Sequence, residues 1–242
     1  MKAEKRIIIS ARLQAIADII PSGSRVADIG TDHGYLPIWL LQNKNIAFAA
    51  ACDVNKGPLE HAKRSAAQYG LATSMVFRLG NGLDCISPDE VDTIVIAGMG
   101  GETIISILEA ASWTNTSTYR LILQPMTKAE LLRPWLAQNG YRFISERLVY
   151  ENHTYFPIME LCGGMDPAEL TLGQIWGGAM LQSDPLQGDA LDKLIKQLSF
   201  ALSGLEKSNS PENAKKAEHH RQLIAQLQTM KEEWIHANSK RN

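Results

Sequence analysis

Apolar residues in the first two thirds of the chain recur in two alternating patterns. Short apolar runs at 25–29, 47–52, 75–79, 92–97 and 120–124 are typical of strands buried on both faces of a sheet. Between them, residues 11–20, 35–41, 58–69, 102–111 and 128–138 place apolar positions at helical spacing. Strand and helix therefore alternate, which predicts an α/β fold with a parallel sheet covered on both sides.

Two further apolar segments, at 141–149 and 154–161, flank a tight turn at 150–153. Because such a short connection joins antiparallel neighbours, we expect one antiparallel strand at the edge of the sheet. The complete pattern predicts a doubly wound, seven-stranded sheet of the class I methyltransferase (Rossmann-like) type.

The pattern changes after Gly164, where we place a domain boundary. Leucines and isoleucines from Leu191 to Leu205 recur at helical spacing, and a second such series runs from Leu223 to Trp234. The polar residues 208–212 interrupt them, with Pro211 suited to the first turn of the second helix. We therefore predict an α/β domain at 1–164 and a C-terminal α-helical hairpin of coiled-coil type at 165–242, packed mainly on itself.

Composition narrows the class of protein. The 242 residues contain three cysteines without C-x-x-C spacing, and no apolar stretch is long enough to span a membrane. These features predict a reduced, cytoplasmic protein with no metal site and no membrane partner. The net charge is −2, yet both ends of the chain are mildly basic and the middle is acidic. An anionic polymer would meet the two ends, although solvated helix faces explain the same charges.

Candidate chemistry begins after the first predicted strand, in the run Asp28-Ile29-Gly30-Thr31-Asp32-His33-Gly34. In an open parallel sheet, ligands bind at the carboxyl ends of the strands, and Gly30 and Gly34 allow close approach to the backbone. A dinucleotide fingerprint would have glycine where this chain has Asp32. A carboxylate repels a pyrophosphate but attracts an ammonium group, so the pattern favours S-adenosylmethionine over NAD.

Later strand ends add matching polar groups. Asp53 follows the second predicted strand and is suited to accept both ribose hydroxyl hydrogens. Asn81, between two glycines after the third strand, can pair with an adenine amino group. The fourth strand ends in Gly98-Met99-Gly100-Gly101, which exposes backbone to a flat ligand. Each cluster alone is also explained by an ordinary turn.

The chain resembles the TrmK family of bacterial tRNA methyltransferases. The resemblance rests on ADIGTDHGYLP at 27–37, IAGMGGETI at 96–104, LILQPM at 121–126 and LRPWL at 132–136, together with the C-terminal helical hairpin. It implies methylation of ring nitrogen N1 of the adenine at tRNA position 22. The chain departs from the family pattern at Asn81, where the family has aspartate, and at Met126, where it has asparagine.

The resemblance also implies two sets of site residues. Asp28, Gly30, Asp53, Asn81 and Gly98 line the cofactor site, and we add the flanking residues Gly34, Val54, Gly82, Ala97 and Met99. The target base is surrounded by Asp32, His33, Gly100, Gly101, Gln124 and Pro125. Tyr35 and Tyr155 are candidate stacking partners for it.

We assign catalysis to Asp32 and His33. The in-plane lone pair of adenine N1 attacks a methyl group directly, so the enzyme mainly positions the reactants. Asp32 then stabilises the positive charge that develops on the base, and His33 does the same as an imidazole acceptor or helps to shed a proton afterwards. For transfer RNA phosphates we select Lys5, Arg6, Arg12, Lys193, Lys196, Lys215, Lys216 and Arg221.

Three other functions are compatible with the sequence. A methyltransferase of the same fold could act on a small molecule or a protein, and a non-catalytic RNA-binding protein could sense S-adenosylmethionine. An NAD-dependent oxidoreductase is disfavoured by Asp32. The sequence leaves the oligomeric state open, with a monomer slightly favoured.

Overall fold

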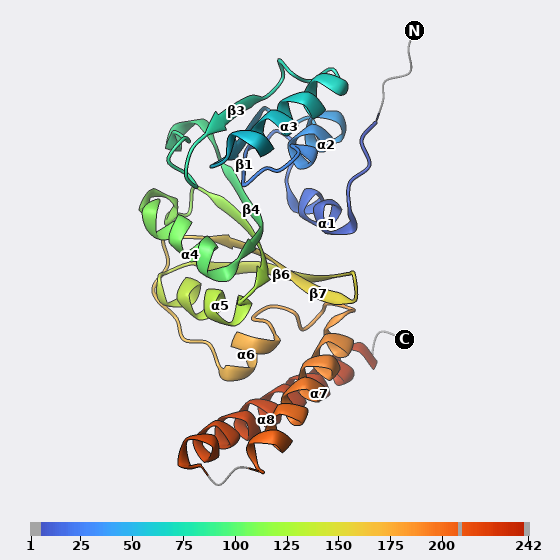
Figure 1. Cartoon of the computed structure of the whole chain (residues 1–242), viewed down its shortest axis with the longest axis vertical. Coiled ribbons are helices and arrows are strands. Elements are labelled where there is room, and N and C mark those ends of the chain that lie inside the picture. Colours follow the sequence, from blue (N-terminus) through green and yellow to red (C-terminus); the bar gives the residue numbers. More distant parts are fainter. Residues whose placement is uncertain (1–5, 208–209, 240–242) are drawn as a thin grey trace.

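The computed structural model describes residues 6–207 and 210–239. Its strands are β1 (Arg25–Ile29), β2 (Phe48–Asp53), β3 (Val76–Leu79), β4 (Thr93–Gly100), β5 (Arg120–Thr127), β6 (Arg142–Glu151) and β7 (Thr154–Cys162). They form one sheet in the order β3-β2-β1-β4-β5-β7-β6 (Figure 1). The predicted doubly wound, seven-stranded sheet is therefore confirmed.

The expected antiparallel strand is not at the edge of the sheet. β7 lies between β5 and β6 and is antiparallel to both, so the edge strand β6 runs parallel to the rest. The prediction was wrong because the second strand of the terminal hairpin, not the first, pairs with β5. Leu121 and Leu123 of β5 face Leu161 and Met159 of β7 and fix this register.

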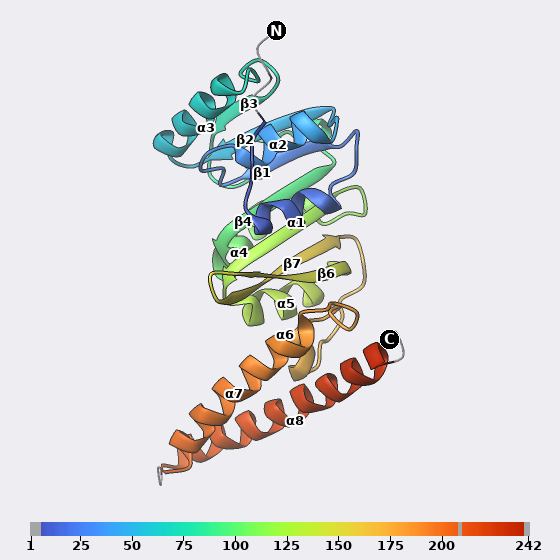
Figure 2. The same ribbon diagram turned by 90° about the vertical axis from the view of Figure 1, so that its right-hand side faces the viewer.

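Five helices cover the two faces of the sheet (Figures 1 and 2). One face carries α1 (Ala11–Ile19), α2 (Tyr35–Asn43) and α3 (Lys56–Gln68), and the other carries α4 (Gly101–Ala110) and α5 (Ala129–Gln138). Successive strand residues point to opposite faces, so Val26 packs in the first layer and Ala27 in the second. Two short 3-10 turns, η1 (Pro88–Glu90) and η2 (Ser112–Thr114), complete the α/β part.

The last two helices, α7 (Gln187–Leu205) and α8 (Pro211–Ser239), form the predicted hairpin, which projects away from the sheet (Figure 2). Leu191, Leu198, Leu223 and Leu227 are buried along its seam. An unpredicted helix, α6 (Leu172–Gly177), packs against both α5 and α8. It is too short for a periodic pattern, although the capping box between Thr171 and Gln174 marks its start.

A buried ion pair joins the sheet to the segment that leads into the hairpin. Arg133 of α5 donates to Glu146 of β6 at 2.7 Å and 2.9 Å, and both side chains are almost fully buried. The second Glu146 oxygen accepts from the backbone of Ala179 and Met180, while Arg133 also donates to the Ile175 carbonyl. One charged network therefore joins the helix layer, the edge strand and the segment that leads into α7.

Candidate active site

The winding of the sheet reverses between β1 and β4, because β2 and β3 lie on one side of β1 and β5 lies beyond β4. The loops that leave these strands diverge, which opens a crevice at their carboxyl ends. A cavity of about 320 Å³ occupies the crevice. It is lined by Ile29, Gly30, Cys52, Asp53, Val54, Asn55, Gly80, Asn81, Gly82, Met99, Thr103, Ser106, Ile107 and Ala110.

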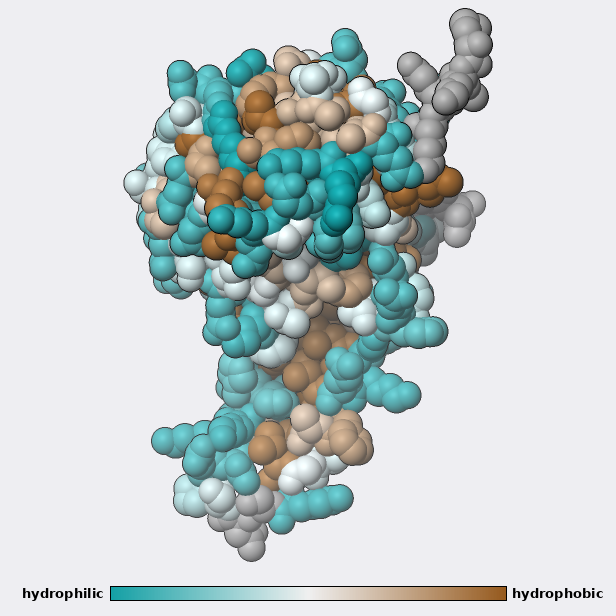
Figure 3. Space-filling model, turned by 45° about the horizontal axis from the view of Figure 1, so that its top comes forward, coloured by the Kyte–Doolittle hydropathy of each residue, from teal (hydrophilic) through white to brown (hydrophobic). Residues whose placement is uncertain are grey.

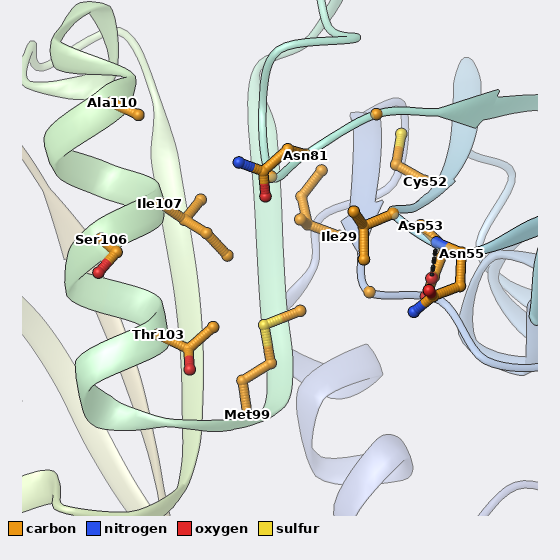
Figure 4. A pocket seen from close by; sticks show the side chains of 14 residues that line it. Ile29, Cys52, Asp53, Asn55, Asn81, Met99, Thr103, Ser106, Ile107 and Ala110 are labelled. Carbon is orange, nitrogen blue, oxygen red and sulfur yellow. Dashed lines mark hydrogen bonds between the residues drawn. The ribbon is translucent and has the colours of Figure 1, made fainter.

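The walls of the cavity differ in chemistry. On one side the carboxylate of Asp53, the last residue of β2, accepts from the backbone of Asn55 at 2.7 Å. Thr103, Ser106 and Ile107 of α4 form the opposite side, with Met99 between the two (Figure 4). Hydroxyl groups of a ligand therefore find an acceptor on the first side, and a flat apolar group fits against the second.

Two glycines bring the backbone close to neighbouring side chains. Gly30 has a φ of +77°, and a Cβ there would lie 2.1 Å from the Met99 methyl carbon. Gly82 has a φ of +56°, and a Cβ there would lie 3.0 Å from two side-chain carbons of Ile107. Both positions combine a left-handed backbone with a close approach, which only glycine combines without strain. The Gly30 contact narrows the cavity on the side of β1 and β4, and the Gly82 contact narrows it beside α4.

The structure brings together most of the predicted cofactor residues but not all of them. Gly30, Asp53, Val54, Asn81, Gly82 and Met99 line the cavity, whereas Asp28, Gly34, Ala97 and Gly98 do not. Asn55 also lines the cavity without having been predicted, and so do the α4 side chains Thr103, Ser106, Ile107 and Ala110. Their spacing along the helix that follows the glycine-rich turn was the available signal.

Asp28 lies within β1 behind the cavity and is buried. Burial raises the pKa of its carboxyl from the ordinary 3.8 to about 6, and the neighbouring charge of Asp53 adds to the rise. At a pH between these two pKa values, the Asp28 carboxyl keeps its proton in the folded protein but releases it in the unfolded chain.

We expect the contribution of Asp28 to stability to be fully present below pH 4 and to be lost as the pH rises through about 6. The change is about 3 kcal/mol in the free energy of unfolding. The substitution Asp28→Asn should therefore stabilise the ligand-free protein at pH 7.5 and leave it unchanged at pH 4. Urea unfolding of both proteins at the two pH values measures the difference, and equal gains at both would contradict the assignment.

The predicted catalytic residues lie in the loop between β1 and α2. The His33 Nε2 atom is 3.2 Å from an Asp32 carboxylate oxygen, and Asp32 is the more exposed of the two side chains. Tyr35, at the start of α2, stacks on His33 with ring centroids 5.0 Å apart. This short segment therefore presents two hydrogen-bond acceptors, the Asp32 carboxylate and the His33 imidazole, beside the flat ring of Tyr35.

Gln124 is fully buried rather than open to a ligand. Its Oε1 accepts from Arg12 at 2.9 Å and from the Gly98 backbone at 3.2 Å, and its Nε2 donates to the Pro125 carbonyl. The Met126 sulfur also lies against the Arg12 guanidinium. Gln124 therefore fixes the ends of β4 and β5 against α1, and Met126 supplies a weak acceptor in that network.

β4 and β5 also extend further than the sequence indicated. Both strands continue through the glycine-rich and proline-containing segments, so Met99 pairs with Pro125 and Gly100 with Thr127. A shift of register between Ala97 and Met99 accommodates the glycines. As a result Gly100 is part of a strand, while Gly101 is buried as the first residue of α4.

Cys52 and Cys85 lie together at the β2 side of the cavity. A hydrogen bond between their side chains lowers the pKa of the Cys85 thiol to about 7 and raises the pKa of Cys52. Both cysteines are free, as is Cys162. No sequence pattern indicates this pair, because the two residues are far apart along the chain.

The predicted phosphate-binding residues fall into three groups. Lys5 lies outside the described residues. Four others bond to protein acceptors. Arg12 donates to Gln124 and Lys193 to the His153 carbonyl, while Lys216 pairs with Glu212 and Arg221 with Glu206 and Glu218. Arg6, Lys196 and Lys215 are exposed, and over residues 6–207 and 210–239 none of them forms an ion pair.

Tyr155 does not lie at the cofactor cavity. It lines a second cavity of about 380 Å³ between β6, β7, α5 and α7, together with Trp176 and Lys193. The Lys193 ammonium lies 5.8 Å from the Tyr155 ring centre, and Tyr150 packs against the same ring. Tyr35 and Tyr155 therefore belong to different surfaces.

Comparison with known proteins agrees with this architecture. Residues 9–159 match the family described as methyltransferase domain. The tRNA (adenine(22)-N(1))-methyltransferase of Bacillus subtilis is 40% identical over 151 residues, a match that spans 62% of this chain and 63% of that protein.

Solved structures match over more of the chain. The B. subtilis tRNA methyltransferase TrmK superposes with a TM-score of 0.84 and 29% identity, covering 93% of this chain and 100% of that one. A Streptococcus pneumoniae protein in complex with S-adenosyl-L-methionine has a TM-score of 0.80 and 30% identity, with coverage of 93% and 100%. Among the described residues, none of the helices combines the length and apolar character needed to cross a bilayer.

Proposed function

The chain belongs to the TrmK family of methyltransferases, and from this premise we propose that it methylates ring nitrogen N1 of an adenine in transfer RNA. The methyl donor is S-adenosylmethionine, and the family resemblance selects the adenine at position 22. The observation that carries the proposal is the cavity at the switch point, which is lined by Asp53, Asn81 and side chains of α4.

The residues of this cavity fit the donor. A carboxylate at the end of the second strand suits a pair of ribose hydroxyls, and the Asn81 carboxamide suits an adenine edge. Ile107 and Ala110 offer apolar contact to a flat base, and the glycine at position 30 keeps the space beside Met99 free of a side chain. When bound, the donor supplies a methyl group activated by its positively charged sulfur.

The loop residues then act on the acceptor base. Tyr35 offers a flat, half-exposed ring at the start of α2, next to His33. The Asp32 carboxylate stabilises the positive charge that forms on the base when N1 becomes methylated. His33, 3.2 Å from that carboxylate, holds it in place and accepts the proton that the exocyclic amino group of the cationic, methylated base gives up.

The transfer RNA contacts are proposed on the exposed cations. Lys196 on α7 and Lys215 on α8 belong to the hairpin, and Arg6 precedes α1. In the space-filling view the hairpin carries hydrophilic side chains along its sides, with apolar ones between them (Figure 3). A cation that forms no ion pair within the described residues binds a phosphate at a lower cost in free energy, because no existing ion pair has to break first.

The direct test is incubation of the protein with methyl-labelled S-adenosylmethionine and unmodified transfer RNA, followed by nucleoside analysis. We expect label in N1-methyladenosine, and label on an exocyclic amino group or on a pyrimidine would contradict the proposal. Label found only on a protein or small molecule would identify another acceptor class.

Replacing Asp32 with alanine should lower turnover about a hundredfold, the lower end of the effect of one preorganised electrostatic group, because this carboxylate is largely exposed. The affinity for S-adenosylmethionine should change less than threefold, since Asp32 does not line the cavity. Single-turnover rates and calorimetric titration measure the two quantities. Equal losses in both would instead place Asp32 in the cofactor site.

A further inference from the structure

Three rings form a column beside the catalytic loop. Tyr35 stacks on His33 with an interplanar angle of 17°, and His33 stacks on His61 with centroids 5.3 Å apart and an angle of 9°. The first two residues follow β1, whereas His61 comes from the second turn of α3. His61 is exposed, so part of its ring surface faces solvent.

A hollow of about 230 Å³ lies beside the His33 and His61 rings of the column. Besides His33 and His61 it is lined by Arg64, Ser65 and Gln68, all on α3. A flat ring for stacking, a guanidinium for a phosphate and a carboxamide for a base edge are the groups that proteins use to bind a single-stranded nucleotide.

A metal ion would be the other ligand for this cluster. Donor atoms of Asp32, His33 and His61 all lie within 4.8 Å of one another. However, a tetrahedral zinc site needs donor atoms about 3.4 Å apart with lone pairs that converge on the ion. The two imidazole planes are nearly parallel, so their in-plane lone pairs do not converge. The geometry favours a flat ligand stacked on the column.

We propose that His61 stacks on a nucleobase next to the target adenine, and that Arg64 binds the phosphate of that nucleotide. The inference rests on the proposed function, because His33 belongs both to this column and to the catalytic pair. A base on the outer face of His61 therefore lies one ring away from the catalytic residues. The subsite would hold the strand on one side of the target while the target adenine enters the crevice.

The test compares His61→Ala with His61→Phe, which keeps a flat ring and removes both nitrogens. Binding of unmodified transfer RNA, measured by fluorescence anisotropy, should weaken about 5- to 150-fold in the alanine variant, the range of one base–aromatic stack. The phenylalanine variant should stay within about threefold of the wild type. Affinity for S-adenosylmethionine should not change in either protein.

Two further measurements identify the ligand. Transfer RNAs with an abasic nucleotide on one or the other side of the target should bind the wild type more weakly at one position only, and His61→Ala should add no further loss there. Arg64→Ala should reduce the dependence of log affinity on log salt by one phosphate contact, or about 0.7 in slope for a single strand. Lys63→Ala is the matched control, because Lys63 already pairs with Glu60 on the same helix.

Each outcome decides the proposal. Unchanged binding by His61→Ala overturns it, and so does a loss that appears equally with every abasic position. If His61→Phe binds as weakly as His61→Ala and EDTA weakens the wild type by the same factor, the cluster is a metal site and the stacking proposal is wrong. Binding is measured without turnover, so a failure of the proposed function would appear separately, in the nucleoside analysis.

Discussion

Asp53→Ala should lower the affinity for S-adenosylmethionine by about two to four orders of magnitude. Asp53 is nearly buried at the end of β2, and one carboxylate oxygen is already used by the backbone of Asn55. Hydrogen bonds to a charged group contribute about 1.5–3 kcal/mol each, and two ribose hydroxyls are expected to share this carboxylate. Isothermal titration calorimetry with the wild type and the variant measures the loss.

Asp53→Asn is the matched control, because it keeps the shape and one acceptor oxygen but removes the charge. Its loss of affinity should be smaller than that of the alanine variant. It should also lower the pKa of Asp28, because the Asp53 charge contributes to the rise at that carboxyl. Affinity within threefold of the wild type in both variants would show that the ribose does not contact Asp53.

The second large effect is expected at the buried ion pair. Arg133→Ala should lower the free energy of unfolding by about 3–5 kcal/mol, because it leaves the Glu146 carboxylate buried without its countercharge. The same change removes the bond from Arg133 to the Ile175 carbonyl. Urea unfolding monitored by circular dichroism measures this change in stability. Because α6 and α7 should loosen in the variant, its affinity for transfer RNA should fall more than its affinity for the cofactor.

Arg142→Ala provides the control for Arg133. Arg142 begins the same strand, β6, but is exposed and contacts only the Cys162 sulfur among the side-chain bonds of the described residues. Its replacement should cost less than about 0.5 kcal/mol, as at other exposed positions. Equal losses in the two variants would mean that the position in the strand, not the buried charge, determines stability.

The parts of the site that follow from strand order could be predicted from the sequence. Asp53 stands directly after one short apolar run and Asn81 two residues after another, and parallel strands bring such ends to one edge. The same logic placed Gly30, Gly82 and Met99 at the cavity. Local pattern and topology agree at these positions, so residues far apart in sequence could be assigned to one site.

Contacts between elements could not be predicted in this way. His61 and Arg64 lie on an exposed helix face, where one pattern of polar residues is compatible with many neighbours. Gln124 follows a strand like the others, but Arg12 of α1 covers it, and no local signal reports that contact. The position of β7 depends on which strand of the hairpin pairs with β5, and apolar alternation does not encode that choice.

The placement of β7 between β5 and β6 has a consequence for synthesis on the ribosome. Until residues 154–162 have emerged, β5 is an open edge with unpaired backbone groups, and its buried leucines lack their partners. A nascent chain that stops before this point exposes a strand able to pair with other chains. We therefore expect the nascent chain to depend most on chaperones after β5 has emerged and before residues 154–162 can pair with it.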